Sequence, residues 1–360
     1  MTKNFSLRAS ILLLVTFLGA AAMSDLHSGD AVSKPIVNTS ELHSGLNASD
    51  LSQSELLLAE HYRIFDSVGN PVVLEDLIRK IKQVDVTFLG ETHTDTIAHS
   101  LQALILKKTS DAHQSLSLEM FESDIQHVVD EYLAGLISEE HFLKSSRPWD
   151  NYSSDYRDLI EYSKETGSPV IAANAPRRYV NMVRRLGQES LFSLSSEAKE
   201  SLPPLPYPNV SSEYENKFRA IMAAHHSIIQ KVSQTEDTIE HDKEQLDLAV
   251  PHPDSSQVDN MEERAFQKML EAQNLWDVGM AWSIASYLKR YPNDRVIHIN
   301  GNFHTDYSLG IPEHLDHYIS DLTTLIVAMV PSREYPSFSK SMKGLGDFII
   351  VTNGKLEPSH

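Results

Sequence analysis

The chain has 360 residues, of which 41% are hydrophobic, so it can bury the core of one large α/β domain with room for a small helical insert. Its formal charge is −19, from 31 Lys and Arg against 50 Asp and Glu, and this charge repels polyanions and argues against nucleic-acid binding. Cysteine is absent, which excludes disulfides, thiol nucleophiles, cysteine metal sites and a lipidated cysteine.

The first residues have the pattern of a secretory signal peptide. Lys3 and Arg8 precede an apolar run from Ile11 to Leu18, and small residues follow up to Ala22. The run is well short of the roughly 20 residues that a membrane span needs, so we expect cleavage near Ala22 and no integral membrane segment afterwards. The expected location is the periplasm or the exterior. Residues 23–55 are polar and aperiodic, and we interpret them as a flexible lead-in.

Strands and helices are expected to alternate along the rest of the chain. Helical spacing appears from Ile97 to Ile105 and from Val128 to Leu136. The expected strands are the short apolar runs 85–89, 116–120, 169–173 and 295–299, and two further apolar runs lie at 322–330 and 348–351. This alternation predicts an α/β fold with a mostly parallel (mixed) sheet covered by helices on both faces.

Residues 186–272 interrupt that alternation. They contain the proline-rich passage SLPPLPYPNV, a helical run and a polar stretch, and they lead into a long helix expected from Met261 to Tyr287. We interpret 186–272 as an inserted helical subdomain or cap. The α/β core is then made of residues 56–185 and 273–354.

Two expected strands end in the same motif, G-x-x-H. The motifs are Gly90-Glu91-Thr92-His93 and Gly301-Asn302-Phe303-His304. The carboxyl ends of parallel strands border a crevice where ligands bind, so His93 and His304 are expected to meet there. Neutral imidazole is a good ligand for zinc and for haem iron.

Carboxylates occupy comparable positions at strand ends. Glu91 lies in the first motif, Glu119 ends the second expected strand and Glu122 follows soon after. With His93 and His304, these groups could hold a divalent metal or act as general acid and base. The alternative is that Glu119 only pairs locally and that one histidine is a satisfied core residue.

Other polar residues are weaker candidates, and each has a purely structural alternative. His99 is a ligand or a solvent-facing helical residue, and at most one of the adjacent His225 and His226 can face the crevice. Asn174 and Asp277 could be ligands or structural hydrogen-bonding groups. The arginines at 177 and 178 could bind carboxylates, including haem propionates, or form a solvated charge pair.

As an ordered set, the motifs resemble the ChaN-like haem-binding family of the wider Tiki and erythromycin-esterase-like superfamily. The resemblance runs from about residue 56 to 331. It rests on the spaced Trp149 and Tyr156 and on the segments LGETHTDTIAH, SLEMF, SPVIAANAPRRYV, AQNLWDVGMAWSI and INGNFHTDYSLGIPEHL. What it implies is an α/β core with a small helical domain and a role in haem binding and iron acquisition at the cell surface.

The resemblance also implies roles for particular residues. For haem it implies iron ligation by tyrosine and histidine in a homodimer, with Tyr156 and Tyr179 as candidate tyrosines and Arg177 and His225 as further candidate contacts. The wider superfamily implies a metal-dependent hydrolytic centre at His93, His304, Glu91 and Glu119. Family members are often lipoproteins, but this chain has no cysteine to lipidate.

Three functional hypotheses follow. The leading one is an extracytoplasmic haem- or iron-binding protein. The alternative is a hydrolase in which His93 and His304 hold a divalent metal ion and Glu91 or Glu119 activates water. The third is a scaffold that keeps the motifs only for packing.

Overall fold

The computed structural model describes residues 51–236 and 255–359. Its centre is one eight-stranded sheet with the strand order β2-β1-β8-β7-β3-β6-β4-β5. The six strands from β8 to β5 run parallel, while β1 is antiparallel to both β2 and β8. The strands are β1 Tyr62–Asp66, β2 Pro71–Val72, β3 Val86–Glu91, β4 Gln114–Glu122, β5 Val170–Asn174, β6 Arg295–Gly301, β7 Thr324–Ser332 and β8 Phe348–Asn353.

This sheet confirms the predicted α/β fold, and each expected strand overlaps an observed one. The strands are near-continuous apolar runs because helices bury both of their faces, and every residue of β3 and β4 is buried. The helices are α2 Leu51–Ala59, α3 Leu74–Ile81, α4 Thr96–Thr109, α5 Gln126–Leu133, α6 Glu139–Ser146, α7 Arg157–Thr166, α8 Arg177–Leu186, α9 Ser196–Lys199, α10 Ser212–Glu236, α11 Ser255–Arg290 and α12 Ile311–Tyr318.

Strand periodicity assigns the helices to the two faces of the sheet. Leu89 of β3 packs in the core cluster that contains α3 to α7, whereas its neighbour Phe88 packs in the cluster that contains α11 and α12. The same alternation separates Ile297 from Val296 on β6. Side chains at the strand ends therefore belong either to the α4 face or to the α11 face.

The helix after β3 is well defined at both ends. The Asp95 side chain accepts hydrogen bonds from the backbone N–H groups of Ile97 and Ala98, at 3.0 and 3.2 Å, and so caps α4. Lys107 and Lys108 lie in its last turn, where cations oppose the negative end of the helix dipole. This geometry fixes the short loop 92–95, which carries His93.

The hairpin of β1 and β2 was not predicted. Its turn is formed by Asp66, whose carboxylate accepts from the N–H groups of Val68 and Asn70, and by Gly69 at a φ of 100°. The helix start at Leu51 lies inside the segment 23–55 predicted to be flexible. The rest of that segment, 23–50, and the predicted signal peptide 1–22 lie outside the described residues.

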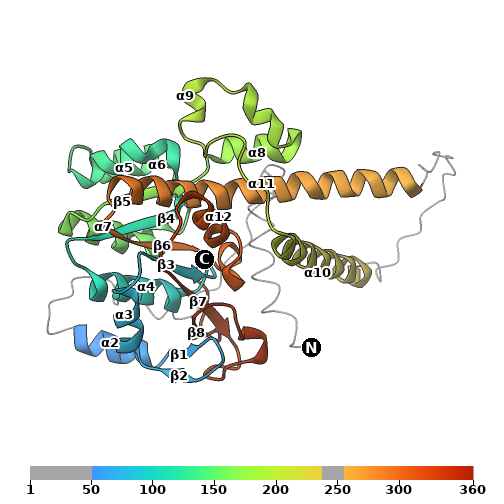
Figure 1. The fold of residues 1–360 in the computed structure, drawn as a ribbon. Coiled ribbons are helices and arrows are strands. Elements are labelled where there is room, and N and C mark those ends of the chain that lie inside the picture. Colours follow the sequence, from blue (N-terminus) through green and yellow to red (C-terminus); the bar gives the residue numbers. More distant parts are fainter. Residues whose placement is uncertain (1–50, 237–254, 360) are drawn as a thin grey trace.

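The predicted long helix is confirmed, with wider bounds. It is α11, which runs without a break through the predicted boundary between insert and core at 272. Figure 1 shows α10 and the first half of α11 extending away from the sheet, while the second half of α11 lies across it. Within 51–236 and 255–359, no helix is long and apolar enough to cross a membrane.

Candidate functional site

The two G-x-x-H motifs lie side by side at the carboxyl edge of the sheet. β6 lies between β3 and β4, and Glu91 at the end of β3 is in register with Gly301 at the end of β6. The Gly301 N–H donates to Glu119 Oε2 of β4 at 2.7 Å. Gly301 therefore lies between the two acidic side chains.

Glu91 organises the network on the α4 face. Its carboxylate contacts His93 Nδ1 at 2.8 Å and His99 Nδ1 at 3.3 Å, and it accepts hydrogen bonds from Gln102 and from the Tyr156 hydroxyl. Burial raises the pKa of Glu91, but His99 and His93 outweigh it, so the net shift of this pKa is downward. Glu91 is thus held as a buried carboxylate.

His99 is part of this network and does not face solvent. It is 4% exposed, and its Nε2 lies 3.4 Å from Asp155 and 3.1 Å from the His93 carbonyl oxygen. Burial lowers the pKa of His99, but the charges of Glu91 and Asp155 raise it above its usual value overall. The solvent-facing interpretation of His99 is therefore wrong.

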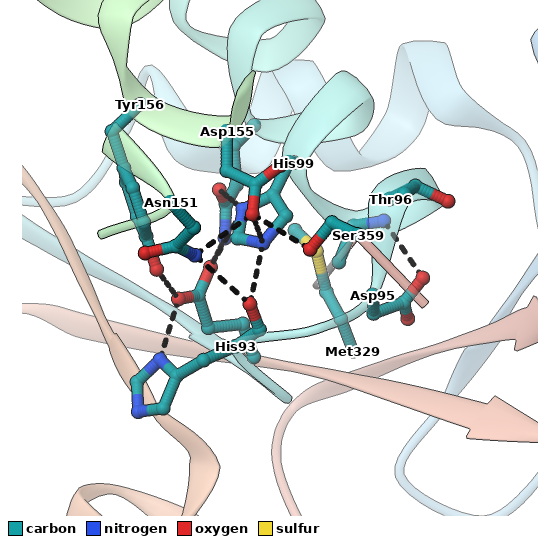
Figure 2. A network of polar contacts seen from close by, with 12 residues as sticks. His93, Asp95, Thr96, His99, Asn151, Asp155, Tyr156, Met329 and Ser359 are labelled. Atoms are coloured by element: carbon teal, nitrogen blue, oxygen red, sulfur yellow. Dashed lines mark hydrogen bonds and ion pairs between the residues drawn. The ribbon is translucent and has the colours of Figure 1, made fainter. Parts of the chain in front are cut away.

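A π-helical turn, Tyr152–Tyr156, brings Asp155 and Tyr156 to the network. Figure 2 shows Asp155, Asn151 and His99 around the backbone of the His93 loop, while the His93 imidazole points away from them. Asn151 donates to Asp155 at 2.8 Å and to the His93 carbonyl at 3.2 Å. The network therefore positions the backbone of His93 as well as its ring.

A second network on the α11 face holds His304. Its Nδ1 is hydrogen-bonded to Asp277 of α11, and its Nε2 lies 3.5 Å from Glu119. The Tyr214 hydroxyl of α10 donates to the other oxygen of Asp277. Both Tyr214 and Asp277 are fully buried. Asp277 thus has the structural hydrogen-bonding role that the sequence left open.

His304 and Glu119 stabilise each other's charged forms. Burial alone would lower the pKa of His304, but the charges of Glu119 and Asp277 raise it to about 10. Burial would raise the pKa of Glu119, but His304 lowers it to about 2. The pair is an imidazolium and a carboxylate over a wide pH range.

The two networks meet at Gly301. A Cβ atom at this position would lie 3.0 Å from His93 Nε2 and 3.7 Å from Glu119 Oε2. The two motifs therefore come close together at Gly301, with His93 held by the network on the α4 face and His304 by the network on the α11 face. His93 has the most exposed side chain of the site histidines, at 15%, against 6% for His304 and 4% for His99.

Replacing Gly301 by alanine is expected to displace the His93 imidazole by a few tenths of an ångström and to destabilise the protein by about 1 kcal/mol. The φ of Gly301 is −61°, so the cost arises from the contact rather than from the backbone. The measurements are urea unfolding and the ring NMR signals of His93. In the His93→Ala variant, Gly301→Ala should change the free energy of unfolding only slightly, because the ring it would contact is absent. An equal loss of stability with and without the His93 ring would contradict this explanation.

Other candidates lie at the ends of β5 and β4 and at the start of α8. Asn174 ends β5 and is buried, and Glu122 ends β4, where it pairs with Arg147 at 2.9 Å and with Arg177 at 3.6 Å. The guanidinium of Arg178 pairs with Asp124. Both candidate arginines thus contact the protein's own carboxylates.

The two candidate tyrosines are both buried. Tyr156 is 1% exposed and Tyr179 is 8% exposed, and the Tyr179 hydroxyl accepts from Arg178 at 3.3 Å. His225 and His226 lie in α10, but their side chains are outside the described part of the chain. A surface hollow of about 420 Å³ contains no strand-end residue; it is lined by Phe192, Lys199, Glu200, Leu202, Pro203, Pro204, Leu205 and Trp282.

The sequence did not indicate these members of the networks: Gln102, Asn151, Asp155, Tyr214 and Ser359. Gln102 had a usable signal, because it lies three residues after His99 on the same face of α4. Tyr214 and Ser359 had no such signal, because both are far in the sequence from their partners. Tyr214 lies 63 residues before Asp277, and Ser359 lies 204 residues after Asp155.

The family model described as haem-binding uptake, Tiki superfamily, ChaN matches residues 77–315, a range that includes both G-x-x-H motifs. The chain belongs to this family. Its sequence-based resemblance to ChaN-like proteins is thereby confirmed. None of the curated proteins matches the sequence.

One solved structure shares the fold. ChaN of Campylobacter jejuni, whose structure is described as showing cofacial haem binding, is 17% identical with a TM-score of 0.58, over 82% of this chain and 98% of that one. A mutant of the erythromycin esterase EreC in its open conformation is 11% identical with a TM-score of 0.39, over 81% of this chain and 83% of that one.

Proposed function

We propose that this protein binds haem outside the cytoplasm and serves in haem or iron acquisition. The observation that carries the proposal is the match to the haem-binding uptake family over residues 77–315. The predicted signal peptide supports an exported protein. The family resemblance also implies a homodimer, which size-exclusion chromatography with and without haemin would test.

The donor groups of the site suit haem better than a bare divalent ion. A porphyrin supplies four nitrogen ligands, so the protein needs to add only one or two axial donors. Catalytic zinc sites use three protein ligands. Within the described residues, no group of three or more His, Asp or Glu side chains is arranged to hold a metal ion. This arrangement favours the haem hypothesis over the metal-dependent hydrolase.

We assign His93 as the residue that would hold the haem iron. It is the most exposed of the site histidines, and Glu91 contacts its Nδ1 at 2.8 Å, which orients the ring. Trp149 packs edge-on against this ring, with centroids 4.6 Å apart. His304 is buried between Glu119 and Asp277, so its role is to hold this edge of the sheet together.

A haemin titration followed by absorbance tests the proposal. Wild-type protein is expected to give a saturable Soret band at micromolar haemin. His93→Ala should weaken binding at least tenfold and shift the band, because the imidazole that would hold the iron is lost. His304→Ala should leave the band position unchanged in whatever fraction of the protein remains folded.

The matched control is His113→Ala. His113 is an exposed histidine directly before β4, so it lies at the amino end of a strand, whereas the site lies at the carboxyl ends. This variant should titrate like the wild type. Absence of any spectral change in the wild type would overturn the haem proposal. Tight binding by His93→Ala with an unchanged band would overturn only the ligand assignment.

A further inference from the structure

Residues 354–359 form a strap that leads from the end of β8 back to the His93 loop. Lys355 to Pro358 are exposed, whereas Ser359 is partly buried. Figure 2 shows Ser359 beside Asp155, inside the polar network of the site. The strap therefore passes over the surface and returns its last described residue to the interior.

Two hydrogen bonds dock Ser359. Its backbone N–H donates to the Thr94 carbonyl oxygen at 3.1 Å, and its hydroxyl donates to Asp155 Oδ2 at 2.7 Å. Asp155 is 7% exposed, and the same oxygen lies 3.4 Å from His99 Nε2 and accepts from Asn151. The Ser359 hydroxyl is thus one of three groups that share a buried carboxylate oxygen.

The strap completes the anchoring of the loop that carries His93. The His93 carbonyl is held by Asn151 and His99, the Thr94 carbonyl is held by Ser359, and the Asp95 side chain accepts from Thr352 of β8. Every residue from 93 to 95 therefore has a distant partner, and two of these partners come from β8 and the strap. Buried carbonyl and carboxylate groups need such partners, so losing one changes the position of the loop.

We propose that Ser359 is a positioning residue for His93. It acts in two ways, by fixing the Thr94 carbonyl next to His93 and by sharing Asp155 with His99. His99 in turn shares the Glu91 carboxylate with His93, at 3.3 Å and 2.8 Å respectively. The effect of Ser359 on haem binding rests on the proposed function. Its effect on the position of His93 does not.

The test compares Ser359→Ala, which removes the hydroxyl donor to Asp155 but keeps the backbone N–H, with Ser359→Thr, which keeps both donors. The first readout is the ring nitrogen NMR signals of His93 and His99 in the haem-free protein, and the second is the haemin titration. Ser359→Ala should shift the ring signals of both histidines and weaken haem binding about tenfold. Ser359→Thr should show the signals and the haem affinity of the wild type. Leu356→Ala is the matched control, because Leu356 is exposed in the same strap, and it should change neither.

The unfolding midpoint of each variant shows whether the fold is intact. Unchanged histidine signals in folded Ser359→Ala would overturn the positioning proposal, as would a failure of Ser359→Thr to restore them. A wild-type protein that binds no haem would overturn the proposed function alone, because the NMR comparison needs no haem. Shifted signals with unchanged haem affinity would overturn the link between Ser359 and haem binding.

Discussion

Replacing Asp277 by asparagine is expected to lower the free energy of unfolding by about 3 to 5 kcal/mol, the range for breaking a buried ion pair. Asp277 is 0% exposed and accepts hydrogen bonds from both His304 and Tyr214. Asparagine keeps the shape of the side chain but removes the charge that compensates the His304 imidazolium. The buried cation is then left with Glu119 alone, at 3.5 Å.

Urea unfolding monitored by tryptophan fluorescence gives this free energy. Asp316→Asn is the matched control, because Asp316 lies exposed on α12 and the chemical change is identical. The control is expected to stay within about 0.5 kcal/mol of the wild type, as surface substitutions do. Equal effects of the two substitutions would show that Asp277 does not compensate a buried charge.

Stability is also expected to depend on pH through His304 and Glu119. The pKa of His304 rises from 6.5 to about 10 on folding, so its stabilising contribution is fully present below pH 6.5 and is lost as the pH rises through 10. The pKa of Glu119 falls from 4.5 to about 2, so its contribution is present above pH 4.5 and is lost as the pH falls through 2. The pair therefore stabilises the fold most between pH 4.5 and 6.5.

Urea unfolding at pH 6 and pH 9.5 measures the alkaline part of this dependence. The wild type should lose on the order of 3 kcal/mol between these values, since each unit of pKa shift corresponds to about 1.4 kcal/mol. His304→Gln should lose much less, because it carries no titrating group at this position. His99 also has a raised pKa and titrates in both proteins, so the difference between them isolates His304. Identical pH slopes would contradict the assigned charge state.

Much of the core could be predicted from local pattern alone. The central strands are unbroken apolar runs, and each motif begins within the last residues of a strand. There the missing Cβ of Gly90 leaves room for the Asn302 side chain, and that of Gly301 leaves room for the His93 ring. The β1–β2 hairpin was missed. It lies at the edge of the sheet, where only one residue of β1 is fully buried and the apolar signal is weak.

The candidate site could be predicted only in its strand-end members. The sequence by itself determined that Glu91, His93, Glu119 and His304 lie at or just after the ends of strands, because the positions of the strands follow from local hydrophobic periodicity. Which of these strands are neighbours was decided by the tertiary structure, where β6 lies between β3 and β4. Only the tertiary structure decided that Glu91 pairs on the α4 face and Glu119 on the α11 face, and that Tyr214 and Ser359 join them. Burying a charge requires partners, and which distant residues supply them depends on how the chain packs.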